Sequence, residues 1–150
     1  MVYINKNEAF TRLNNIFNNK QAGFEYLRNT LIFERMLDEV ITFNRKINWE
    51  SNSANLKLVT TAEEFIKICN LRSEIYGNLG YQKEFPDFLP NMNFDFYDLN
   101  SAIIYNLTNS EITATCRLIF DSDKKLPIEE KLDLSSIRSK FQNIAEVSRL

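Results

Sequence analysis

Charged side chains lie inside apolar segments at several places in this chain, and this feature limits its possible folds most strongly. Arg72 stands within a helical apolar stripe, four residues after Ile68 and three before Ile75. A charge that leaves water is costly unless an opposite charge pairs with it. Three arginines and three carboxylates occur in such settings: Arg72, Arg117, Arg149, Asp95, Asp98 and Glu146. We therefore predict one charge-balanced electrostatic cluster that forms where the fold brings these six residues together.

The length and the charge bound the class of protein. At 150 residues the chain fits one domain, and its 44% hydrophobic content is enough for a packed core. The net charge is −2 at pH 7 and no basic block occurs, so nothing in the sequence indicates nucleic-acid binding. A basic patch created only by folding is the alternative that stays open.

The cysteines and the apolar runs bear on location. Cys69 and Cys116 lie in apolar runs without the spacing of a metal site, and a reduced, buried pair suits a cytosolic protein. Residues 1–8 contain no signal-peptide-like region, and no apolar stretch is long enough to span a bilayer. We predict a cytoplasmic protein without an integral membrane segment.

Missing residue types exclude several kinds of chemistry. The chain has no histidine, which excludes Ser-His-Asp and Cys-His nucleophilic mechanisms as well as histidine-ligated metals. We predict no metal site. The three glycines, Gly23, Gly77 and Gly80, cannot form a GxGxxG or Walker A loop. Catalysis by this chain would have to use carboxylates, hydroxyls, arginines and backbone amides.

The first third of the chain has a helical pattern. Apolar residues recur at three- and four-residue spacing between Phe24 and Ile47, and the helical pattern covers residues 7–49. Such a broad stripe is typical of a core or an interface. A polar run at residues 48–55 then predicts a linker. We therefore divide the chain into a helical N-terminal extension, residues 1–50, and a second part, residues 51–150.

The second part begins with a short strand at residues 56–60. Thr61 and Glu64 have the spacing of a capping box, which begins a helix that should end near Gly77 or Gly80. A long loop rich in aromatic and acidic residues follows at residues 81–100. We expect Arg72, on this helix, to contact a carboxylate of that loop.

Three strands are predicted after the loop, at residues 102–107, 112–120 and 143–150, and they should lie adjacent and antiparallel with the capped helix on one face. Alternation along the middle strand puts Thr113, Thr115 and Arg117 on one polar face. On the last strand Glu146 and Arg149 are three residues apart, so a regular strand would place them on opposite faces. A bulge would realign them. The predicted fold class is α+β.

Five motifs follow one another along this part of the chain: Arg72 with Tyr76, Asp95-Phe-Tyr-Asp98, Ala114-Thr-Cys-Arg-Leu118, Leu126-Pro127 and Ala145-Glu-Val-Ser-Arg-Leu150. Together with the order of the predicted elements, over about residues 56–150, they resemble the first half of a GNAT-type acyltransferase. The motifs are similar to those of its autoinducer-synthase-like branch, which includes acyl-homoserine lactone synthases, long-chain N-acyl amino acid synthases and acyltransferases of exosortase systems. The last two motifs favour the N-acyl amino acid synthase side.

The sequence departs from this family at two points. The family commonly shows Glu-x-Asp where this chain has Asn93-Phe-Asp95, so one expected carboxylate is missing. The resemblance also implies a loop and helix N-terminus after the last strand, whose amides bind the phosphates of CoA or of an acyl-carrier protein. We expect residues 51–150 to be the N-terminal half of such a domain, truncated before that loop and inactive alone.

The activity that the resemblance implies is N-acyl transfer from acyl-CoA or acyl-carrier protein to the amine of an amino acid or a similar small molecule. Glu146 would be the catalytic base. Arg72, Arg117 and Arg149 would hold the acidic loop and could bind a substrate carboxylate, and Asp95 and Asp98 would attract the ammonium or lock that loop. A purely architectural ion-pair network is one alternative. The other is a non-catalytic binding or regulatory module that uses the N-terminal helices for protein contacts, including a homodimer.

Overall fold

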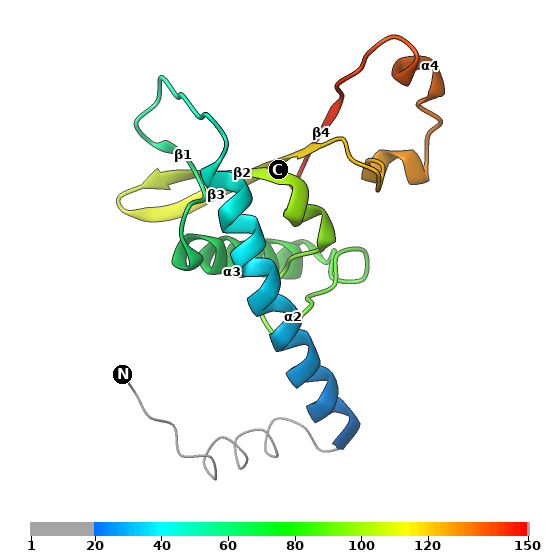
Figure 1. Cartoon of the computed structure of the whole chain (residues 1–150). Coiled ribbons are helices and arrows are strands. Elements are labelled where there is room, and N and C mark those ends of the chain that lie inside the picture. Colours follow the sequence, from blue (N-terminus) through cyan, green and yellow to red (C-terminus); the bar gives the residue numbers. More distant parts are fainter. Residues whose placement is uncertain (1–19, 150) are drawn as a thin grey trace. The chain divides into compact units, whose positions relative to one another are not determined.

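The structure is a computed structural model that describes residues 20–149. A helix comes first and a four-stranded antiparallel sheet with its own helix follows, which confirms the predicted α+β class (Figure 1). The chain divides into two compact units, Met1–Glu34 and Arg35–Leu150. This division falls inside helix α2 (Lys20–Arg45), whereas the sequence placed a boundary near residue 50.

Helix α2 is shorter than the helical pattern predicted. Residues 7–19 of the predicted helix lie outside the described residues, and the prediction is wrong for residues 46–49, because the helix ends at Arg45. The backbone amide of Lys46 then donates to Phe43 in a turn. In the first unit, the side chains of Phe24, Leu27 and Leu31 are 71%, 48% and 67% exposed, so this part of the apolar stripe does not belong to the core.

The last turns of α2 belong to the second unit and support its sheet. Val40 and Asn44 have no exposed surface. The Asn44 side chain donates to the carbonyl of Ser101 at 3.0 Å and accepts from the amide of Ile103 at 2.9 Å. The side chain therefore pairs with the backbone of strand β2 (Ser101–Thr108), as a neighbouring strand would.

Helix α3 (Ala62–Leu79) has the ends that its sequence predicts. Thr61 Oγ1 accepts from the Glu64 amide at 3.3 Å, and Glu64 Oε2 accepts from the Thr61 amide at 3.0 Å. The two bonds form a capping box. The helix stops at Gly80, whose φ of 75° is a left-handed conformation that glycine adopts without a side-chain clash.

The sheet has the strand order β1-β2-β3-β4, and every neighbouring pair is antiparallel. This order confirms the predicted adjacency of the last three strands. Strand β2 lies between β1 and β3, and β3 lies between β2 and β4. Besides β2, the strands are β1 (Leu56–Leu58), β3 (Glu111–Phe120) and β4 (Ala145–Ser148).

Helices contact both faces of this sheet. Tyr105 of β2 donates its hydroxyl proton to Glu64 of α3 at 2.8 Å, so α3 covers the face that also carries Arg117 and Ile119. Phe120 points to the other face, where its ring centroid lies 6.0 Å from that of Phe43 in α2. Arg117 and Ile119 are 3% and 1% exposed, so the arginine stands in a covered layer.

A bulge changes the faces predicted for β3. Asn106 pairs with Ala114 but Leu107 pairs with Ile112, which leaves Thr113 as an extra residue. An extra residue shifts the alternation of side chains by one position. The shared face predicted for Thr113, Thr115 and Arg117 is therefore wrong for Thr113, which lies at the exposed bulge. Thr115 and Arg117 do share a face, but Arg117 is buried under α3.

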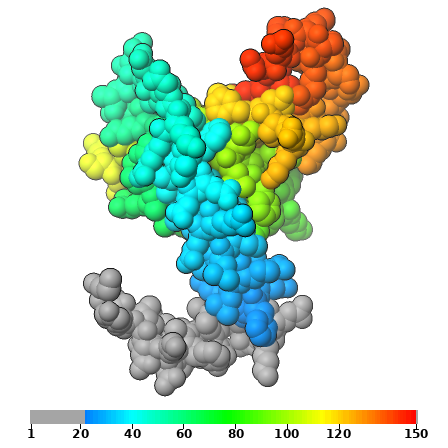
Figure 2. Space-filling view, viewed as in Figure 1, coloured from blue at the N-terminus to red at the C-terminus, as the bar shows by residue number. Residues whose placement is uncertain are grey.

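Two short segments complete the second unit. A 3₁₀ helix, η1 (Phe96–Asn100), leads from the acidic loop into β2. The connection between β3 and β4 contains a second 3₁₀ helix, η2 (Pro127–Glu130), and a one-turn helix, α4 (Ser135–Arg138). This connection lies on the surface, where Figure 2 draws it in orange. Within residues 20–149, no helix combines the length and the apolar character that a membrane crossing requires.

Candidate functional site

The predicted cluster forms in the second unit, and Asp98 is at its centre. The Nη1 atom of Arg72 lies 3.0 and 3.2 Å from the two carboxylate oxygens of Asp98, and Nη1 of Arg117 lies 3.0 Å from Oδ1. Asp98 has no exposed surface, and Arg72 is 1% exposed. The contact predicted between Arg72 and a carboxylate of the acidic loop is therefore confirmed.

Asp95 joins the third arginine to this centre. Nη1 and Nη2 of Arg117 donate to its two oxygens at 2.5 and 2.9 Å, which is a bidentate arrangement. Nη2 of Arg149 donates to Oδ2 of the same carboxylate at 2.6 Å. The structure thus connects five of the six predicted residues through two aspartates.

The 3₁₀ helix η1 fixes both aspartates by a local sequence pattern. Asp95 Oδ1 accepts from the Tyr97 amide at 2.9 Å, and Asp98 Oδ2 accepts from the Asp95 amide at 3.0 Å. The three-residue spacing of the acids is therefore a capping box that also presents their remaining oxygens to the arginines. Tyr97 adds its ring, whose centroid lies 5.9 Å from the guanidinium carbon of Arg117.

Arg149 reaches the cluster by leaving the strand. Strand β4 ends at Ser148, and Arg149 has a φ of 57°, which turns its side chain toward Asp95. The sequence predicted that Glu146 and Arg149 would lie on opposite faces of a regular strand, or that a bulge would realign them. Neither occurs, because Arg149 lies after the strand in a left-handed conformation. Its guanidinium lies 5.2 Å from the ring centroid of Tyr76 and 4.6 Å from that of Phe85, which are cation–π distances. Phe85 was not predicted, and its only sequence signal is its place in the aromatic loop.

Asn93 stands at the position where the resemblance described above led us to expect a carboxylate. Its Oδ1 accepts from Arg149 at 3.1 Å, while its Nδ2 donates to the carbonyl of Phe85 at 2.8 Å. An ionised carboxylate could accept the first bond but could not donate the second. The amide is 1% exposed and serves both, so it fits this position better than an acid would.

Glu146 stands beside the cluster rather than in it. It is paired with Ile119 across the sheet, which puts it on the face that carries Arg117. Its Oε2 accepts from the backbone amide of Ile128 at 2.9 Å. Within residues 20–149 it forms no ion pair, so the prediction of six clustered residues is wrong for this one. The five clustered residues carry three positive and two negative charges.

Burial and charge set the protonation states of the site. Burial alone would raise the pKa of Asp95, but the hydrogen bonds and charges of Arg117 and then Arg149 outweigh it and lower the pKa to about 2. Burial strongly raises the pKa of the Cys69 thiol and also raises that of Cys116. Both cysteines are free, although Cys116 is only half-buried, and neither thiol is activated as a nucleophile.

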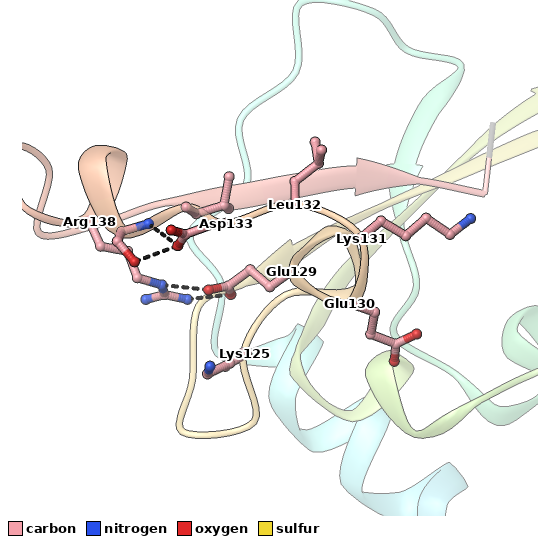
Figure 3. Close-up of a pocket in the computed structure, with 9 residues that line it drawn as sticks. Lys125, Glu129, Glu130, Lys131, Leu132, Asp133 and Arg138 are labelled. Atoms are coloured by element: carbon pink, nitrogen blue, oxygen red, sulfur yellow. Dashed lines mark hydrogen bonds and ion pairs between the residues drawn. The ribbon is translucent and has the colours of Figure 1, made fainter.

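A second group of charges lies in the β3–β4 connection. Arg138 binds Asp121 and Glu129 at 2.6 Å each, and Figure 3 shows Arg138 with Glu129 at the edge of a surface pocket of about 400 Å³. Asp133 accepts from the amide and hydroxyl of Ser135 in the same loop. These bonds fold the connection back on itself. No residue of the predicted site lines this pocket.

In comparisons with known proteins, no protein-family model, no curated protein and no solved structure matches the chain. Its function must therefore be argued from the geometry of the cluster.

Proposed function

We propose that the chain supplies the amine-binding side of an N-acyltransferase. The enzyme would move an acyl group from acyl-CoA or an acyl-carrier protein to the amine of an amino acid or a similar small molecule. The observation that carries the proposal is the buried cluster built from Arg72, Arg117, Arg149, Asp95 and Asp98, with Glu146 on the same face of the sheet.

The reaction needs a base and a donor for the developing oxyanion. The amine nitrogen forms a bond to the thioester carbonyl, the thiolate leaves, and a proton leaves the nitrogen. Glu146 suits the base because only Oε2 of its carboxylate is engaged, by the Ile128 amide. Within the described residues Oε1 makes no hydrogen bond. Glu146 also supplies the negative charge that attracts an ammonium, while Asp95 and Asp98 lock the acidic loop to the three arginines.

The test is turnover by the natural full-length protein, followed by mass spectrometry of the products from acyl-CoA and mixed amino acids. Glu146→Gln keeps the shape of the side chain and its hydrogen-bond acceptor but removes the base. We expect turnover to fall roughly 10²-fold or more, with substrate binding changed far less. Glu111→Gln, at the exposed start of β3, is the matched control. Wild-type turnover by Glu146→Gln would reject the catalytic role.

A second candidate function is a binding module that uses the N-terminal helix. It is favoured by the exposed side chains of Phe24, Leu27 and Leu31, which stand three and four residues apart on α2. An apolar stripe of this kind fits a partner helix, including a second copy of the chain. The same assay separates the two functions, because a binding module forms no acylated product with any amine.

A further inference from the structure

Arg72 uses only one of its three guanidinium nitrogens. Nη1 binds Asp98, whereas Nε and Nη2 have no hydrogen-bond partner within residues 20–149, and the side chain is 1% exposed. A guanidinium has five N–H donors in a fixed plane. Buried donors are nearly always satisfied, so two neighbouring unpaired donors on one edge point to an acceptor that the described residues do not provide.

A pocket lies beside this arginine. It has a volume of about 110 Å³, several times the roughly 10–15 Å³ of probe-occupied volume that one water needs. Strand β4 pairs with residues 117–120 of β3, and its final residue, Ser148, lies opposite Arg117. The β3 residues of the pocket, at positions 113–115, therefore lie beyond the end of β4. The lining residues are Arg72, Ile75, Tyr76, Thr113, Ala114, Thr115 and Arg149.

The charges around the pocket favour an anion. The other two arginines of the cluster are occupied: Arg117 by both aspartates and by Ser148, and Arg149 by Asp95 and Asn93. The cluster still carries one positive charge more than its two carboxylates neutralise. The edge of Arg72 is therefore where an added negative charge would find both free donors and uncompensated positive charge.

We propose that this pocket binds the carboxylate of a small molecule, with its two oxygens accepting from Nε and Nη2 of Arg72. These two N–H groups are parallel and match the spacing of a carboxylate, which makes the contact bidentate and charge-assisted. The opposite end of the guanidinium stays on Asp98. The identity of the ligand rests on the proposed function. If the protein is an N-acyltransferase, the carboxylate is that of the amino acid that accepts the acyl group.

The binding test uses the full chain and no acyl donor. The ¹⁵N resonance of the Arg72 side-chain Nε–H group is followed by NMR while sodium acetate is added at constant ionic strength. Acetamide, which has nearly the same shape but no charge, and sodium chloride are titrated in parallel. We expect a saturable shift of this resonance with acetate and little response to the other two. An equal response to all three, or no response to acetate, would overturn the proposal.

A pocket variant makes the assignment specific. Ile75 lines the pocket from α3, one turn after Arg72, and takes part in none of the ion pairs. Ile75→Trp enlarges the side chain at the pocket wall and should weaken acetate binding about tenfold or more. Ile137→Trp, at an exposed position of α4, is the matched control and should bind acetate as the wild type does. A backbone amide spectrum that is unchanged outside the pocket verifies the fold. Undiminished binding by a folded Ile75→Trp variant would place the anion elsewhere.

The two proposals fail separately. Acetate binding to Arg72 combined with wild-type turnover of Glu146→Gln would leave the carboxylate site standing and remove the catalytic base. Acyl transfer that is lost in Glu146→Gln, combined with no acetate shift at Arg72, would leave the enzyme standing and remove the carboxylate site.

Discussion

The second unit contains two arginine–carboxylate networks that have similar contact distances and very different surroundings. In the buried cluster, Arg72, Arg117 and Arg149 bind Asp95 and Asp98 over 2.5–3.2 Å. In the surface cluster, Arg138 binds Asp121 and Glu129 over 2.6–2.8 Å. Asp98 has no exposed surface, whereas the Arg138 and Asp121 side chains are 32% and 23% exposed.

The comparison shows that contact distance says little about the role of an ion pair. On the surface, water replaces a lost partner and salt screens the charge, so each pair contributes little. At the centre of the buried cluster, around Asp98, no water can replace a partner, and removing one charge leaves the others stranded. Asp95, at the edge of this cluster, has a side chain that is 29% exposed. The balance of charge differs too: the buried cluster has an excess of arginine and the surface cluster has an excess of carboxylate. An excess positive charge in a buried cluster is costly unless a further negative charge, such as that of a bound ligand, pairs with it.

The largest expected effect is that of removing the centre of the buried cluster. Asp98→Ala leaves Arg72 without its carboxylate and removes one of the two that bind Arg117, so we expect the free energy of unfolding to fall by about 3–5 kcal/mol. Urea denaturation at pH 7 measures it. Asp121→Ala removes an equivalent carboxylate from the surface cluster and is the matched control. Equal losses from the two substitutions would contradict the comparison.

A smaller effect is expected from the titration of Asp95. Its pKa is lowered to about 2 in the folded chain, against about 3.9 in the unfolded chain. Asp95 therefore stabilises the fold fully above the unfolded value, and this contribution is lost as the pH falls through the folded value. The shift corresponds to about 2.5 kcal/mol.

Asp95→Asn isolates this contribution, because the amide resembles the protonated acid in shape and charge. The free energy of unfolding of the wild type should exceed that of the variant by about 2.5 kcal/mol at pH 7, and the difference should shrink from about pH 5 and be nearly closed at about pH 2. Other carboxylates, including Glu129 of the surface cluster, titrate in both proteins and cancel in the difference. A gap that stays constant down to pH 2 would show that hydrogen bonding alone, and not ionisation, explains the role of Asp95.

The sequence predicted those parts of the fold and site that depend on local patterns. The capping box at Thr61, the stop at Gly80 and the three antiparallel strands follow from spacing over a few residues. The contact of Arg72 with Asp98 was predictable for a different reason. A charge inside an apolar stripe has few alternatives to an opposite charge, and the nearest acidic loop follows the helix.

The parts that were missed depend on contacts between distant segments. Asn44, in the last turn of α2, bonds through its side chain to backbone 57 and 59 residues away, and no local pattern in the sequence indicates this. The left-handed φ of Arg149 and the stacking on Phe85 likewise need the tertiary fold. The bulge at Thr113 shifted faces that simple alternation had assigned. Glu146 was predicted to join the charged cluster, but its partner is a backbone amide that the sequence could not indicate.

The smallest expected effect is that of Arg138→Ala in the surface cluster. The substitution removes contacts to Asp121 and Glu129, but the 23% exposed Asp121 can be solvated, and Glu129 keeps the backbone amide of Leu126 as a donor. Salt screens the repulsion between the two carboxylates. We expect a fall in melting temperature well below that caused by Asp98→Ala. The fall should shrink between 0.1 M and 1 M salt, as the Debye length drops from about 10 Å to about 3 Å. The loss caused by Asp98→Ala should stay nearly constant over the same range, because ions do not enter the buried cluster. An Arg138→Ala effect that is large and independent of salt would mean that the β3–β4 connection stabilises the sheet as much as the buried cluster does.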